Sequence, residues 1–98
     1  MTPDQIRIQT IRNLGLSPLE AKIVLALYAD RDGPMSISEL LDAVGTDAHN
    51  SLRTALSRVR AVLGPDAIVS TKPTRPTYWM TAETHDRIGR LLARKAAA

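Results

Sequence analysis

The side chains best suited to chemistry lie along one side of a single predicted helix, which spans residues 47–63. At about 100° per residue, that side presents amide, hydroxyl and guanidinium groups. The residues are Asn50, Arg53, Thr54, Ser57 and Ala61, with Arg58 and Arg60 at the two edges. Short polar side chains of these types can read base-pair edges in a major groove, while flanking arginines meet phosphates. A solvated basic helix surface would show the same pattern, so this helix alone leaves both interpretations open.

The opposite side of the same helix is apolar. Its residues recur at the i, i+3, i+4, i+7 spacing that places side chains in one stripe. They are Leu52, Ala55, Leu56, Val59, Val62 and Leu63. Such a stripe is stable only when other elements bury it. We therefore expect the polar side to face outward and the remaining elements to supply a core beneath the apolar side.

The composition of the chain indicates one domain. With 98 residues, of which 44% are hydrophobic, the chain can bury a modest core. It has no cysteine, which excludes disulfides and thiolate metal sites and fits a reducing compartment. No apolar run approaches the roughly 18 residues needed to cross a bilayer, and residues 1–10 lack the apolar segment of a signal peptide. We expect a soluble, cytoplasmic protein that contacts no membrane.

The sequence lacks the patterns typical of an enzyme or a metal protein. It contains no HExxH, P-loop or GxSxG motif, and its two histidines are widely separated. His49 is expected near a phosphate, and His85 on the surface. Residues 30–39 resemble part of an EF-hand loop, but Tyr28 stands where that loop needs its first oxygen ligand. We expect no enzymatic activity, no metal and no cofactor.

Formal charge is distributed unevenly along the chain, although the net charge is only +3. Residues 1–47 carry a formal charge of −3, residues 48–80 carry +4, and residues 81–98 carry +2. Positive charge therefore gathers in the polar helix and in the segment that follows it. This distribution is expected of a protein that turns one side toward a polyanion.

Capping signals predict three helices before the polar helix. In a capping box, a serine or threonine and a glutamate or glutamine three residues later each bind the other's backbone amide. The pattern occurs three times, at Thr2/Gln5, Ser17/Glu20 and Ser36/Glu39. The predicted helices cover residues 3–14, the apolar segment after Ser17 that forms the centre of the core, and the short segment that Gly45 ends.

The order of the remaining elements indicates a helix-turn-helix followed by a hairpin. Thr46 and Asp47, the predicted N-cap, join the short helix to the polar helix. After Gly64 the periodicity changes from 3.6 to 2, which predicts strands at residues 67–71 and 76–80. The prolines of the hairpin tip make it stiff, and its basic side chains are Lys72 and Arg75.

The predicted fold class is α+β, mainly α: a winged helix-turn-helix. Residues 16–81 form its three-helix core and its C-terminal β-hairpin wing. Residues 1–15 add an N-terminal helix, and residues 82–98 add a C-terminal helix, over 82–95, and a tail. Within the second strand, Tyr78 and Trp79 must point to opposite faces, so one of them is expected in the core.

Residues that cap these helices or fill the core carry a resemblance to a known family. They are Leu16, Pro18, Glu20, Ser36, Leu40, Leu52, Arg58, Val59, Arg60, Leu63, Gly64 and Tyr78. Over residues 16–80 the chain resembles the DNA-binding effector domain of OmpR/PhoB-type response regulators. The resemblance implies a recognition helix in the major groove, a wing at the adjacent minor groove, and DNA contacts by Arg58 and Arg60.

The chain departs from that family at three places. It shows no receiver domain and no N-terminal β-sheet, and it has PTRP where the family's wing is rich in glycine. Its segment LGLSPLEAKIVLAL also resembles the start of TrmB-type winged-helix regulators, whose later residues it matches less well. The resemblance therefore supports the expected fold more strongly than it supports any mode of regulation.

Together these patterns predict a sequence-specific double-stranded DNA-binding transcriptional regulator of a prokaryote or phage. Sequence choice is assigned to Asn50, Arg53, Thr54 and Ser57, and binding to phosphates and the minor groove is assigned to Arg58, Arg60, Lys72 and Arg75. The rival hypothesis is a protein-interaction winged helix that binds and redirects a host regulator or polymerase through the same basic side. Architectural, non-specific DNA binding is a third hypothesis, which the modest net charge disfavours.

The two terminal helices are the predicted surfaces of a homodimer. One recognition helix reads few base pairs, so DNA-binding proteins of this type commonly act as pairs. The alternative is that residues 3–14 and 82–95 pack on their own domain and that the protein is a monomer. The sequence does not decide between these two states.

Overall fold

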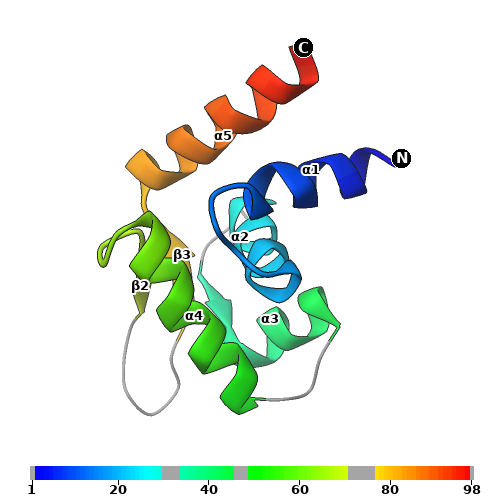
Figure 1. The fold of residues 1–98 in the computed structure, drawn as a ribbon. Helices are drawn as coiled ribbons and strands as arrows, with labels where there is room; N and C mark the ends of the chain where they lie inside the picture. The colour runs from blue at the N-terminus through cyan, green and yellow to red at the C-terminus, as the bar shows by residue number, and fades with distance from the viewer. Residues whose placement is uncertain (1, 30–33, 46–48, 71–76, 98) are drawn as a thin grey trace.

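The computed structural model describes residues 2–29, 34–45, 49–70 and 77–97, with backbone only for residues 49, 50 and 95–97. Five helices and three short strands follow one another in this part of the chain (Figure 1). They are α1 (Pro3–Arg12), α2 (Pro18–Ala29), β1 (Met35–Ser36), α3 (Ile37–Val44), α4 (His49–Leu63), β2 (Ile68–Ser70), β3 (Thr77–Met80) and α5 (Ala82–Ala97). The predicted N-cap Asp47, the residues compared with an EF-hand before Pro34, and the wing tip lie outside the described residues.

All three predicted capping boxes are confirmed. The Thr2, Ser17 and Ser36 hydroxyls accept bonds of 3.2, 3.2 and 3.1 Å from the amides three residues later, and each partner side chain accepts from its cap amide. Helix α1 nevertheless ends at Arg12 rather than at residue 14. The Gly15 amide bonds to the Arg12 carbonyl at 2.8 Å, which closes a turn at a φ of 103° that favours glycine.

The sheet has three antiparallel strands, in the order β1-β3-β2. The predicted hairpin is present, with Ile68 opposite Met80 and Ser70 opposite Tyr78. The prediction of two strands was incomplete, because β1 pairs with the other edge of β3, with Met35 opposite Tyr78. Tyr78 is buried and Trp79 is half-buried, so the expected division between the two aromatic residues is confirmed.

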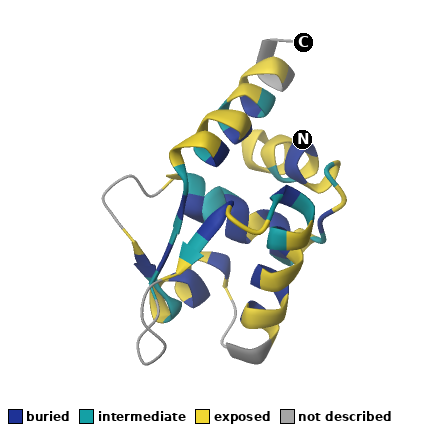
Figure 2. Ribbon diagram, turned by 90° about the vertical axis from the view of Figure 1, so that its left-hand side faces the viewer, coloured by how far each residue is buried: buried dark blue, intermediate teal, exposed yellow. Residues whose placement is uncertain are grey.

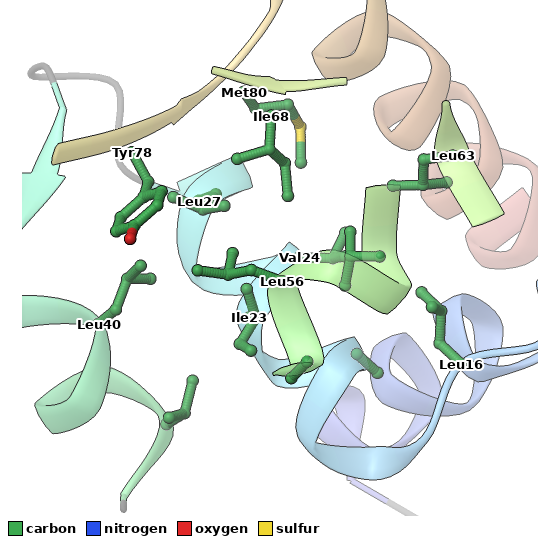
Figure 3. Close-up of a cluster of buried hydrophobic side chains, with 14 of the residues drawn as sticks. Leu16, Ile23, Val24, Leu27, Leu40, Leu56, Leu63, Ile68, Tyr78 and Met80 are labelled. Atoms are coloured by element: carbon green, nitrogen blue, oxygen red, sulfur yellow. The ribbon is translucent and has the colours of Figure 1, made fainter. Parts of the chain in front are cut away.

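Helix α2 occupies the centre of the core, as predicted. It contacts α1, α3, α4 and β3, and its Ala21, Ile23 and Val24 are completely buried. Figure 3 shows the cluster that forms around it, with labelled side chains from α2, α3, α4, β2 and β3 and from the segment before α2. The labelled members are Leu16, Ile23, Val24, Leu27, Leu40, Leu56, Leu63, Ile68, Tyr78 and Met80. The predicted fold class, mainly α with a small sheet, is confirmed.

Helix α5 packs on the core through Ile88, which is 0% exposed, and through Leu92, which is also buried. Thr81 caps its start, accepting a 3.3 Å bond from the Thr84 amide, and the helix continues to Ala97, two residues beyond the predicted end. Its first turns are fixed to α2, because the His85 ring stacks on Tyr28 at 4.3 Å and its Nε2 donates to the Tyr28 carbonyl at 3.1 Å. His85, predicted to be a surface residue, is therefore half-buried and contacts α2. Beyond this contact, α5 extends past α1, away from the start of α4 (Figure 1).

Candidate nucleic-acid interface

The outer side of α4 is exposed, and its inner side is buried. Leu52 and Val59 are 0% exposed, and Ala55, Leu56 and Leu63 are also buried, so the predicted apolar stripe faces the core. On the opposite side, Arg53, Thr54 and Ser57 are exposed. In Figure 2, α4 stands at the right with exposed residues along its outer side. The helix is thus held by its apolar stripe while its polar side chains are free to meet a partner.

The terminal helices do not cover this side. Both α1 and α5 lie at the end of the molecule away from the first turn of α4, in Figure 1 and again in Figure 2 after a 90° turn. Three of the eight residues predicted to contact DNA, Arg53, Thr54 and Ser57, are brought together here. For Asn50 only the helical backbone is described, and Lys72 and Arg75 lie outside the described residues.

Arg58 lies at one edge of the outer side and forms an ion pair. Its Nε is 3.4 Å from Oε2 of Glu20 at the start of α2. The two partners differ in environment, because the Arg58 side chain is 64% exposed and that of Glu20 only 7%. Because the pair uses only Nε of an exposed guanidinium, Arg58 keeps N–H donors that can bind another anion.

The carboxylate of Glu20 both caps the start of α2 and contacts Arg58. Its Oε1 accepts the 3.1 Å bond from the Ser17 amide while its Oε2 faces Arg58. Replacement by alanine would leave the part-buried Ser17 amide without its acceptor, which we expect to lower the free energy of unfolding by about 1–2 kcal/mol. Glutamine keeps an acceptor oxygen and loses only the charge, so Glu20→Gln should cost less than about 1 kcal/mol. Urea unfolding of both variants checks this, and equal losses would show that the ion pair, not the cap, is the stabilising contact.

Arg60, at the other edge, is half-buried and connects α4 to the sheet. Its Nε donates a 3.1 Å hydrogen bond to the carbonyl of Ile68 in β2. This bond uses one of the five guanidinium donors and fixes the position of the group between helix and strand. Sequence reasoning had assigned Arg60 to DNA alone, and the structure adds this second role.

A third arginine contact was missed by sequence reasoning altogether. Arg87 of α5 donates through Nη1 to the carbonyl of Leu63, the last residue of α4, at 3.4 Å. Carbonyls in the last turn of a helix have no partner within it, and a cation near them is favourable. No sequence signal indicates this contact, because the two residues are 24 positions apart and belong to different elements.

Other kinds of site find little support in the described part of the chain. Among those residues, no group of three or more histidine, cysteine, aspartate or glutamate side chains is placed to hold a metal ion. None of the described helices is both long enough and apolar enough to cross a membrane. Every buried polar side-chain atom described has a hydrogen-bond partner, so no orphaned group points to an absent ligand.

No protein-family model matches the chain, and no curated protein sequence matches it. The solved structures that share its fold include the following two. The transcriptional regulator Tm0710 from Thermotoga maritima superposes with a TM-score of 0.69 at 16% identity, over 95% of this chain and 63% of the regulator. The ST1889 protein from the archaeon Sulfolobus tokodaii superposes with a TM-score of 0.66 at 16% identity, over 99% of this chain and 93% of that protein.

These similarities confirm the predicted fold, a winged helix-turn-helix. The chain spans 63% of the Thermotoga maritima regulator, less than two thirds, so more than a third of that protein has no counterpart in the alignment. At 16% identity neither neighbour transfers residue roles. The resemblance to the OmpR/PhoB type stays a prediction from the sequence.

Proposed function

We propose that the chain is a sequence-specific double-stranded DNA-binding transcriptional regulator of a prokaryote or phage, acting in the cytoplasm. The observation that carries the proposal is the exposed polar side of α4, whose opposite side is buried in a winged-helix core. A helix held in this way projects its side chains into a major groove. The likeness to the Thermotoga maritima protein, described as a transcriptional regulator, supports the same conclusion.

Sequence choice belongs to the middle of the outer side, where Arg53, Thr54 and Ser57 are exposed, together with Asn50 one turn earlier. Arg53 can donate two bonds to guanine, and the amide of Asn50 has the geometry to pair with adenine. Arg58 and Arg60 at the edges bind phosphates, and the wing residues Lys72 and Arg75 bind phosphate and the minor groove.

Arg53→Ala and Arg58→Ala are expected to have different kinds of effect on DNA binding. Arg53→Ala should relax the preference at one base position, a loss of about 1–3 kcal/mol of discrimination. Arg58→Ala should weaken binding to all duplexes alike and reduce the slope of log K against log salt by about 0.9, one phosphate contact. Arg58 is the better choice for this test than Arg60, whose bond to Ile68 contributes to the fold.

Both variants are measured after selection of bound duplexes from a random pool, followed by titration at several salt concentrations. A selected motif supports the proposal, and uniform binding without a motif would contradict sequence specificity. Failure to bind any duplex at low salt, with recovery of one stoichiometric protein partner, would instead favour the protein-interaction function. Equal loss of specificity in both variants would contradict the division of roles.

The regulator is proposed to bind DNA as a homodimer through its terminal helices. Helices α1 and α5 pack beside the three-helix core and bury Ile11 and Ile88 in it, while α1 also carries Ile6, a large apolar side chain that is 40% exposed. Pairing would place two copies of α4 on successive half-sites. Sedimentation at micromolar concentration should give the mass of a dimer, whereas the mass of a monomer would contradict this arrangement.

A further inference from the structure

A row of arginines lines a hollow on α5, away from the outer side of α4. Glu83, Arg87, Arg90 and Arg94 follow one another at intervals of four, three and four residues, the spacing that keeps side chains on one side of a helix. With Leu91 they line a hollow of about 270 Å³, here called the α5 groove. Leu91 is half-buried, whereas Glu83 and the three arginines are exposed.

The positive charge of the α5 groove is not neutralised within the described residues. The only ion pair between described side chains is that of Arg58 with Glu20, on another side of the molecule. Arg87 and Arg90 donate only to backbone carbonyls, of Leu63 and Asp86, at 3.4 Å each. Exposed guanidinium groups without carboxylate partners, placed around an apolar floor, form a surface to which an anionic partner is complementary.

We propose that the α5 groove binds an acidic segment of a protein partner. Its carboxylates would meet Arg87, Arg90 and Arg94 through paired N–H···O bonds, and one apolar side chain between them would cover Leu91. Glu83 sets the direction of the segment, because its carboxylate repels an acidic residue and attracts a basic one at that end of the groove.

The chemistry of the groove favours this partner over DNA. A phosphate backbone offers no apolar group to fill a hollow whose floor is Leu91. The position of the groove also favours a protein partner. Helix α4 has 15 residues and is about 22 Å long, and the groove begins beside its last residue, Leu63. A duplex that contacts α4 from Asn50 to Arg60 would meet the groove only at its Arg87 end, because α5 runs away from the start of α4 (Figure 1).

A second copy of the chain is also a poor occupant. In a two-fold interface the same surface faces itself, so the arginines of one copy would stand opposite those of the other. Like charges placed opposite one another cost several kcal/mol, and only Glu83 in the groove could offset them. A homodimer formed through the terminal helices would therefore leave the α5 groove at its edge or outside it.

The probe is a short fluorescent peptide with blocked termini. Its glutamates at positions i, i+3 and i+7 are spaced to meet Arg87, Arg90 and Arg94, and its leucine at i+4 is placed to cover Leu91. A lysine at one end is included to meet Glu83. We expect saturable binding by fluorescence anisotropy. The double variant Arg90→Glu/Arg94→Glu should weaken binding at least about tenfold, and a probe with serine in place of leucine should bind at least about threefold more weakly. Arg87 is left unchanged because it also contacts Leu63.

The matched control is Arg7→Glu/Arg12→Glu on α1, which reverses the same number of exposed helical arginines outside the groove. It should leave peptide affinity within about threefold of the parent, and thermal unfolding should show that both variants remain folded. Equal weakening by both pairs, or no binding of the probe, would overturn the proposal.

Two further measurements test whether the α5 groove instead binds DNA or a second copy of the chain. Both reversals should leave the sedimenting mass unchanged, and the α5 reversal should then leave affinity for duplex DNA within about threefold of the α1 reversal. A selective loss of duplex affinity would assign the groove to DNA, and a change of mass would assign it to a second copy. Either result would overturn the proposal for the α5 groove. Neither result would test DNA binding by the outer side of α4, so failure of this proposal can be told apart from failure of the proposed function.

Discussion

Ser57→Glu is expected to reduce the affinity for duplex DNA at least about a hundredfold. Ser57 is exposed near the middle of the outer side of α4, where the proposed complex places base edges and flanking phosphates. A carboxylate there is both longer than the hydroxyl and of the same charge as the phosphates, and such like-charge contacts cost several kcal/mol. Affinity is measured by titrating labelled duplex at fixed salt, since the electrostatic part depends on ionic strength.

The control for this variant is Ala93→Glu, which adds the same charge at an exposed position of α5. Glutamate is compatible with a helix at both sites, so neither variant should lose more than about 0.5 kcal/mol of folding stability. Because α5 belongs to the proposed dimer surface, sedimentation must first show that both variants keep the mass of the parent protein, and the control should then bind DNA within about threefold of the parent. If Ser57→Glu binds as well as Ala93→Glu does, the outer side of α4 is not the DNA-binding surface.

Leu56→Ala is expected to lower the free energy of unfolding by about 2–5 kcal/mol. Leu56 is only 2% exposed and belongs to the cluster around α2 (Figure 3). Truncation removes the transfer free energy of its side chain and leaves a cavity that the surrounding helices refill only in part. For a domain with the usual total of about 5–15 kcal/mol, this is a large fraction.

The free energy of unfolding of Leu56→Ala is measured by urea unfolding, and Val62→Ala is the control. Val62 lies on the same helix and is half-buried rather than buried, so its truncation should cost about 1 kcal/mol. A similar loss in both variants would mean that α4 is held by its whole apolar stripe rather than anchored at Leu56.

The parts of the fold that were predictable are those determined by neighbours in sequence. A capping box needs only two residues three positions apart, so the starts of α1, α2 and α3 follow from Thr2, Ser17 and Ser36. The apolar stripe of α4 is likewise a local pattern, and the burial of Leu52 and Val59 follows from it. The outer side of the candidate site could therefore be assigned before any tertiary contact was known.

The parts that were not predictable depend on contacts between distant residues. Strand β1 has only two residues and is defined by its pairing with β3, so no local period indicates it. The bond of Arg60 to Ile68 and the stacking of His85 on Tyr28 likewise join different elements. An arginine at the edge of a polar helix looks the same in sequence whether its guanidinium faces solvent or a neighbouring carbonyl.

The arrangement of the sheet has a consequence for the behaviour of the protein in concentrated solution. Its central strand, β3, is paired on both sides, and the strands at the two edges, β1 and β2, have only two and three residues. Unpaired amides and carbonyls at a sheet edge are the template on which chains aggregate, and edges this short offer little of it. Within the described residues, the same pairing that fixes the wing to the core therefore also guards the protein against edge-to-edge polymerisation.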